Sequence, residues 1–292
     1  MDPSATDALR LVSNANLSAD SCDVYVRSSR SQALVGDGNI NTRFRSLKVS
    51  GSAAQRGDPI IVTGDPYRIE ENAPAAGNPF QAAIDQVTQA VAQPSCTAAN
   101  TGQSYSGGSV DPGTYCGATQ FDGVQFNPGL YVIASASADG TNAGRLTLKG
   151  TLDGSRGVSF YFAGRDASLV SYQAALDSVL IAPSAGATRG LLFFESGDRD
   201  GRWSLAIDGV NAQSFEGLVH LPTADVVMRS LSEWPKLKTA IVANTLQLDS
   251  LSIAITPFAW VPDGATSPVT YDPGVISRTV WATSDRPIRI SK

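Results

Sequence analysis

The sequence is poor in charge, in histidine and in long apolar runs. Only 17% of the 292 residues are charged, the formal net charge is −5, and there is a single histidine. Because lysine and arginine are spread out rather than clustered, nucleic acid is not expected as a partner. No apolar run approaches the roughly 18 residues of a membrane-spanning helix. No signal peptide is recognisable, and we interpret the start, Met1-Asp2-Pro3, as a cut inside a longer protein.

Glycine and proline, in contrast, are plentiful. There are 27 glycines and 16 prolines, and 42% of the residues are hydrophobic. This composition is typical of many short strands joined by turns, and it is too apolar for a disordered chain.

Three cysteines are present. Cys96 and Cys116 lie in polar, turn-like sequence and are expected to form a disulfide that closes a short loop. The loop-closure model gives such a bond about 3 kcal/mol of stabilisation. Cys22 remains, either as a small buried apolar residue or with a partner that lay before Met1. The second interpretation is slightly favoured, but the pairing of Cys22 stays open.

Two similar turns organise the middle of the chain. Asp111-Pro112-Gly113-Thr114-Tyr115 and Asn127-Pro128-Gly129-Leu130-Tyr131 each precede a short apolar run, and Asp/Asn-Pro-Gly predicts a type II turn. Turns that recur at a short interval favour stacked coils. We therefore predict an all-β fold, a right-handed parallel β-helix over residues 1–256 with an irregular tail over 257–292. A two-sheet β-sandwich is the alternative.

One helix interrupts the strands. Residues 79–92 carry Phe80, Ile84, Val87 and Val91 at helical spacing, with Asn78 as the expected N-cap and Pro94 after the end. The helix lies in an insertion over about residues 72–95. Its apolar stripe is interpreted as a surface that packs on the coils. Continuous apolar runs such as GVSFYF and GLLFFE predict strands that are buried on both faces.

Several segments, in this order, resemble one family. They are Asp2-Pro3-Ser4-Ala5 with Ala8-Leu9, Cys22-Asp23-Val24-Tyr25-Val26 with Ser28-Ser29, PGTYCG, NPGLYVI, GVSFYF, LIAPSAGATRGLLFFE, GLVHLP and IVANTLQL. Together they look like the exported region of TadG-like proteins of the Tad (tight-adherence) Flp pilus system. The resemblance covers most of residues 2–250.

The resemblance implies a β-helix outside the cytoplasmic membrane, anchored by an N-terminal helix that the given sequence lacks. Its implied partners are pilus subunits, other envelope proteins or a surface ligand. The chain departs from the family at three points. Ser-Gly-Asn-Ala repeats survive only in fragments such as Val49-Ser50-Gly51, His220 stands where tyrosine is frequent, and the cysteine usually found before the Leu-Asp-Pro-Ser segment is absent.

The β-helix fold also hosts polysaccharide lyases and hydrolases, which are enzymes. His220 lies in an apolar run and is interpreted as structural, and no Gly-x-Ser-x-Gly elbow accompanies it. A pair of carboxylates could hydrolyse glycosides. The candidates lie in turn sequences, where aspartate usually bonds its own backbone; they are Glu195, Asp198, Asp200, Asp139, Asp153 and Asp166. No enzyme activity and no cofactor are therefore expected.

The sequence contains two further candidate sites, one for a metal ion and one for contact with a partner. Asp198 and Asp200 resemble the start of a calcium loop, but the remaining oxygen ligands and the bidentate acid at the twelfth position are lacking, so that metal binding there is only a weak candidate. Aromatic residues dominate interface hot spots. The candidate contact residues are Trp203, Trp234, Trp260 and Trp281.

The sequence therefore predicts a non-enzymatic structural or adhesive component associated with the Tad/Flp pilus, in the cell envelope or outside the cell. The first alternative is a polysaccharide-binding or polysaccharide-cleaving β-helix. The second is an ice-binding β-solenoid, which also carries Pro-Gly-x-Tyr turns and a side helix. An ice-binding face needs regularly spaced threonines, and the threonines here do not recur at coil spacing.

Overall fold

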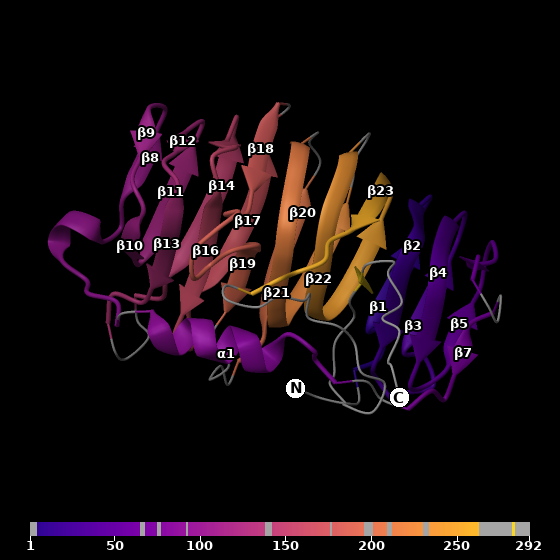
Figure 1. The fold of residues 1–292 in the computed structure, drawn as a ribbon. Helices are drawn as coiled ribbons and strands as arrows, with labels where there is room; N and C mark the ends of the chain where they lie inside the picture. The colour runs from indigo at the N-terminus through magenta and orange to yellow at the C-terminus, as the bar shows by residue number, and fades with distance from the viewer. Residues whose placement is uncertain are drawn as a thin grey trace.

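The strands of this chain turn back every few residues and stack into a three-sided parallel β-helix (Figure 1). The computed structural model describes residues 5–64, 68–74, 77–91, 93–137, 142–175, 177–195, 201–208, 212–229, 234–262 and 282–283. Within them every strand pairing is parallel except that of β2 with β24. The predicted all-β solenoid with one flanking helix is confirmed.

Each side of the coil stack is one parallel sheet. Two strands, β21 (Ala212–Arg229) and β22 (Trp234–Asp249), bend round the corners and contribute to all three sides. The first side also contains, in spatial order, β8 (Ser104–Ser106), β11 (Ala118–Asp122), β14 (Arg145–Gly150), β17 (Ser168–Ala174), β20 (Trp203–Asp208), then β1 (Leu9–Val12), β3 (Leu34–Asp37) and β5 (Ala53–Gln55).

The other two sides follow the same order. The second side contains β9 (Ser109–Val110), β12 (Gln125–Phe126), β15 (Asp153–Gly154), β18 (Ser178–Ile181), β23 (Ser252–Pro257), the first halves of β2 (Asn16–Val26) and β4 (Asn41–Val49), and β6 (Ile61–Val62). The third side contains β10 (Gly113–Cys116), β13 (Gly129–Ala134), β16 (Val158–Ala163), β19 (Leu191–Glu195), the second halves of β2 and β4, and β7 (Glu70–Glu71).

The order of the coils in space differs from their order in sequence. The coils of residues 104–257 run from one end of the stack to the middle, and the N-terminal coils continue the stack from there (Figure 1). Leu9 pairs with Leu246 and Asn16 with Ser252 at this junction. The chain then returns from β7 to the far end through the helix α1 (Gln81–Ala90).

Helix α1 lies across the outside of the third side (Figure 1). Phe80 and Ile84 are buried against that sheet, and Val87 and Val91 are half-buried against it, as the apolar stripe predicts. The strands beneath are consequently covered on both faces. In β16, Phe160 points into the solenoid and Tyr161 points toward the helix side. This double burial accounts for the continuous apolar runs.

Two local predictions need correction. The helix begins at Gln81 and ends at Ala90, because residues 79 and 80 form a turn in which Asn78 Oδ1 accepts the N–H of Phe80 at 3.1 Å. The Pro-Gly turns are not type II turns, since Gly113 and Gly129 are already the first strand residues, with φ of 158° and 142° rather than about +80°. A Cβ on Gly129 would lie 2.8 Å from Pro112 Cβ, so that the stacked turn itself requires glycine.

The chain leaves the coil stack after β23. Instead of forming a third-side strand, the residues after Pro257 cross the outside of the sheet to Trp260, whose Nε1 donates to the Arg189 carbonyl at 2.7 Å. The third-side position left in this way is taken by β24 (Ala282–Thr283), which pairs antiparallel with β2 and also contacts β22.

Candidate functional site

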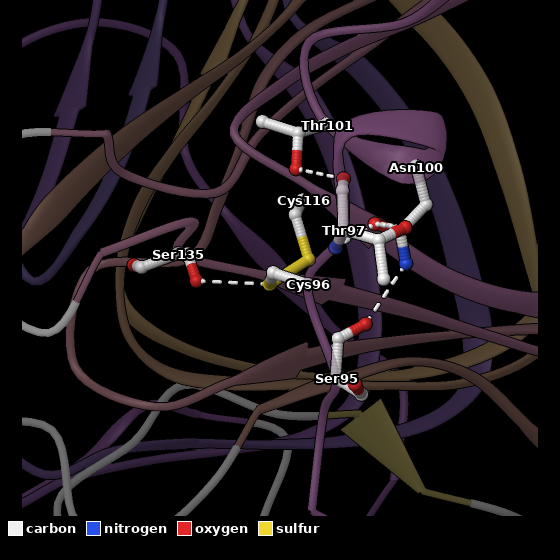
Figure 2. Close-up of a disulfide and its surroundings, with 7 residues drawn as sticks. All are labelled: Ser95, Cys96, Thr97, Asn100, Thr101, Cys116 and Ser135. Carbon is white, nitrogen blue, oxygen red and sulfur yellow. Dashed lines mark hydrogen bonds between the residues drawn. A yellow bond between two sulfur atoms is a disulfide. The ribbon is translucent and has the colours of Figure 1, made fainter.

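A disulfide closes the far end of the coil stack (Figure 2). Cys96 and Cys116 are joined as predicted, with their Cα atoms 5.8 Å apart. Next to the bond, a single turn of 3-10 helix, η1 (Ala98–Asn100), is held by a capping box in which the Thr97 N–H donates to Asn100 Oδ1 at 2.6 Å. Thr101 forms a bridge with Cys116. This segment therefore covers the edge of β10.

The disulfide also bears on where the protein resides. Disulfides form and persist in oxidising compartments such as the periplasm or the extracellular space. Among the described residues, no helix is both long enough and apolar enough to cross a membrane. The anchoring of a longer protein remains an expectation from the resemblance.

The two Pro-Gly turns stack and form a polar ladder along one corner. The Tyr131 hydroxyl lies 2.7 Å from the carbonyl oxygen of Val110 and 2.8 Å from that of Asn127, and the two carbonyls share its single proton. Tyr115 bonds the Asp111 carbonyl in the same way. Outside, Asn127 Nδ2 donates to Asp111 Oδ1 at 2.6 Å, and its Oδ1 accepts from Arg156 at 2.6 Å. The polar side chains of these turns thus form hydrogen bonds that hold the corner of the coils.

His220 is enclosed between the third side and α1. Its Nε2 accepts a hydrogen bond from Asn78 Nδ2 at 2.7 Å, so the ring proton resides on Nδ1, which has no partner among the described residues. Burial lowers the pKa of His220 to about 3. A histidine that stays neutral, covered and joined to the start of a helix fits the structural interpretation.

Glu195, one of the carboxylate candidates for glycoside hydrolysis, is also buried. It lies at the end of β19, is fully buried, and accepts hydrogen bonds from Trp203 Nε1 at 2.9 Å and from the N–H and hydroxyl of Thr223 at 2.6 and 2.8 Å. The carboxylate fastens one coil to the next. Because the Glu195 side chain is fully buried, its carboxylate is not exposed to solvent.

The remaining carboxylate candidates do not gather around Glu195. Asp153 is bonded to Ser155 and Gln125, and these hydrogen bonds lower its pKa. Asp166 lies exposed at a bend. Asp139, Asp198 and Asp200, the last two being the weak calcium candidates, lie outside the described residues. Within the described part of the chain, no group of three histidine, cysteine or acidic residues could hold a metal ion.

The tryptophans do not form a common surface. Trp260 is buried against Phe80, with ring centroids 5.9 Å apart, so its prediction as an exposed contact residue is wrong. Trp203 is half-buried, packs against Phe162 and donates to Glu195. Trp234 belongs to β22, but its side chain is not described, and Trp281 lies outside the described residues.

Cys22 is a buried thiol inside the N-terminal coils. It is fully buried, and its Sγ lies 3.6 Å from the Ile255 carbonyl. Burial, reinforced by Asp23, raises the pKa of Cys22 to about 12. The structure therefore supports the interpretation of a small core residue and disfavours the one with an external disulfide partner.

A groove lies between the C-terminal end of α1 and the third side of the coil stack. Its volume is about 420 Å³. Val87, Val91, Leu130 and Val132 make its apolar part; Ala90, Gln93, Ser95, Gly113, Thr114, Ala187 and Thr188 complete the lining. This size is within the range of ligand pockets, and the lining includes no charged residue. It can hold an uncharged, partly apolar group.

Comparison with known protein families, with curated proteins and with solved structures finds no match for this chain.

Sequence reasoning missed the groove and the contact between Asn78 and His220. Asn78 was assigned to helix capping, which its Oδ1 partly performs, while its Nδ2 reaches a histidine 142 residues away in the sequence. The groove combines α1, β10, β13 and the loop before β19. No local pattern marks either feature, because both depend on where the helix lies on the sheet.

Proposed function

We propose that this chain is a non-catalytic structural or adhesive module of an exported protein associated with a Tad/Flp pilus, acting in surface attachment or pilus assembly. The association with a pilus rests on the family resemblance of the sequence. The observation that carries the non-catalytic role is the enclosure of Glu195 and His220, which removes the strongest candidates for an acid, a base or a nucleophile's partner from contact with a substrate.

The architecture supports a rigid presenting role. Parallel sheets on all three sides, a helix along one of them and a disulfide at one end keep the surface of the stack fixed. A preorganised surface loses little conformational entropy on binding. The groove beside α1 is then the first surface to test for contact with a pilus subunit, another envelope protein or an attachment surface.

The test of this function begins with a strain that lacks the gene. Attachment to surfaces is measured, and pili are counted by electron microscopy. Lost pili would assign the protein to assembly, whereas normal pili with lost attachment would make it an adhesin. If neither changes, the pilus proposal is wrong.

A matched pair of helix variants then tests the groove. Ala90 lines the groove and is exposed, so Ala90→Trp should fill it without disturbing the core. Ala82 is exposed on the same helix and does not line the groove, so Ala82→Trp is the control. We expect attachment or piliation to fall several-fold with Ala90→Trp alone. Equal attachment and piliation in the two strains would mean that the groove is not the contact surface.

The two alternatives receive less support from the described surface. The groove has no aromatic residue in its lining on which a sugar ring could stack. The first side carries ion pairs, Asp122 with Lys149 at 3.2 Å and Asp208 with Arg229, rather than a threonine array. One outward row of that side contains a single threonine and reads Ser104, Gln120, Thr147, Ser171, Ala206, Val227, Gln247 and Arg10. Binding or cleavage in a glycan panel, or thermal hysteresis, would reverse this ranking.

A further inference from the structure

The outer face of the first side carries its charges in one row. The outward side chains at this level of successive coils are, in spatial order, Ser106, Asp122, Lys149, Gln173, Asp208, Arg229 and Asp249. Asp122 pairs with Lys149 at 3.2 Å on one side of Gln173, and Asp208 pairs with Arg229 on the other. Each of these four charged side chains is still 31–51% exposed, so it is accessible to a second partner.

This row of charges is complementary to itself. Consider a second copy placed face to face with the first, about a two-fold axis that runs along β17 through Gln173. The axis reverses the order of the coils and keeps the level of the row. Lys149 would then face Asp208 of the second copy, and Asp122 would face Arg229 of the second copy. Every one of these charges would have the opposite sign both beside it and across the contact.

Neighbouring registers bring like charges together. With the axis on β14, Lys149 would face Lys149 of the second copy, and with the axis on β20, Asp208 would face its own counterpart. An axis between β14 and β17 places Asp122 opposite Asp208, and one between β17 and β20 places Lys149 opposite Arg229. Like charges that face each other across a contact are unfavourable. Of these five registers, the one with the axis on β17 alone avoids them.

An exposed apolar side chain lies on the same strand. Val170 is the extra residue of a β-bulge in β17, at the register shift opposite Leu146 and Thr147. Its side chain is 45% exposed, and Ile61, on the second side, is the other exposed large apolar residue among those described. About the axis along β17, Val170 would pack against Val170 of the second copy. The centre of the contact would thus bury apolar surface, and the charges would lie around it.

We propose that the first side is the interface of a homodimer whose two copies pack face to face about a two-fold axis along β17. The contact spans the seven strands from β8 to β22. At about 4.8 Å per strand and about five residues of 3.3 Å each, it covers about 1,100 Å² on the two copies together. This area is near the lower limit of specific interfaces. The dimer therefore depends on protein concentration, and salt weakens it by screening the ion pairs.

Two charge variants test the register by sedimentation equilibrium at low salt. One carries Asp122→Lys and Asp208→Lys, so that its four charges are all positive. The other carries Lys149→Asp and Arg229→Asp, so that its four charges are all negative. We expect the native chain to dimerise, each variant alone to stay monomeric, and an equimolar mixture of the two to dimerise again. Circular dichroism of each variant checks that the fold is kept.

The apolar centre is tested with a matched pair of single substitutions. Val170→Asp places a charge on the axis, and Ile61→Asp places the same charge at a similarly exposed residue away from the contact. We expect Val170→Asp to weaken dimerisation at least tenfold and Ile61→Asp to leave it unchanged.

Cross-linking then locates the axis. In a Cys22→Ala background that keeps the Cys96–Cys116 disulfide, Gln173→Cys is treated with a short bismaleimide. Gln247→Cys is the control, because Gln247 lies three coils from β17 and its two copies are about 29 Å apart in the proposed dimer. We expect covalent dimers from Gln173→Cys alone.

A native chain that stays monomeric at every concentration would overturn the proposal. So would charge variants that fail to associate when mixed, or equal effects of the two aspartate substitutions. Cross-linking of Gln247→Cys as efficient as that of Gln173→Cys would show that the copies meet through another face or in another register.

Discussion

Tyrosine hydroxyls inside the coils satisfy main-chain carbonyls at the corners, where the strands break and backbone groups lose their ladder partners. Tyr131 is the clearest case, because its ring is fully buried and its hydroxyl serves two carbonyls. Burial raises the pKa of this hydroxyl above its ordinary value of 10, which favours the protonated form that donates. The residue thus joins core packing to turn geometry.

Tyr131→Phe is expected to destabilise the protein by about 1–3 kcal/mol, since two buried carbonyls lose their donor while the ring volume is kept. The free energy of unfolding from urea denaturation measures this. Tyr105→Phe is the control, because Tyr105 packs in the same aromatic group and its hydroxyl makes no hydrogen bond within the described residues. Equal losses for the two variants would contradict the role assigned to the Tyr131 hydroxyl.

His220 makes stability depend on pH. Its folded-state pKa of about 3 lies below the ordinary value of 6.5, so the unfolded chain binds a proton that the folded one does not. The stabilising contribution is complete above pH 6.5 and is lost progressively as the pH falls toward 3. The size of the shift corresponds to a loss on the order of 4–5 kcal/mol.

This dependence is isolated by comparison with His220→Gln, whose amide oxygen can still accept from Asn78. We expect the unfolding free energy of the native chain to fall more steeply between pH 6.5 and 3 than that of the variant, whose remaining slope comes from carboxylates. Parallel slopes would show that His220 is accessible to protons in the folded state.

At the scale of elements, the two ends of the stack differ. The end formed by β8, β9 and β10 is covered by η1 and fastened by the disulfide, whereas the opposite end finishes in the short strands β5, β6 and β7. Exposed strand edges can pair with other chains. A cross-link placed at one end therefore protects that end from fraying and from edge pairing.

Replacement of Cys96 and Cys116 by serine is expected to cost about 3 kcal/mol, as estimated for a loop of this length. Hydrogen exchange of β8, β9 and β10 should rise more than that of β3 and β4. Cys22→Ala, which removes a buried thiol without a disulfide, is the control and should leave exchange at the β10 end unchanged. A uniform rise in exchange throughout the chain would contradict a local role for the bond.

At the scale of the whole molecule, the junction of the first and last coils dominates the folding problem. Leu9 must find Leu246, and Asn16 must find Ser252, a sequence separation of 236 residues. Non-local pairings slow folding, because the loop-closure entropy is lost before the contacts form. Helix α1 bridges the stack because the chain has to return from β7 to β8.

A circular permutant that begins at Gly77, continues through Lys292 to Met1 and ends at Pro74 places the coils in their spatial order. We expect it to refold at least several-fold faster than the native order, with a similar unfolding free energy, because the junction pairs become more local. Stopped-flow refolding measures the rate. A permutant that folds no faster would mean that another step, such as coil nucleation at the disulfide end, limits the rate.

The sequence by itself determined the class of fold and much of its detail. Short apolar runs between Gly, Pro and Asn turns predicted parallel coils, the spacing of Phe80, Ile84, Val87 and Val91 predicted a packed helix, and Cys96 with Cys116 predicted the disulfide. These features are local, or depend on two residues whose surroundings resemble each other, so that periodicity and turn chemistry are enough to find them.

Only the tertiary structure decided the order of the coils, the burial of Trp260, the contact of Asn78 with His220, and the antiparallel pairing of β24 with β2. Each depends on which distant segments meet: the N-terminal coil adds to β22 on one edge as well as to the next coil in sequence on the other, and the helix covers one side of three. Strand edges present similar backbone groups wherever they occur. Their pairing is therefore selected by packing of the whole chain, which no local pattern encodes.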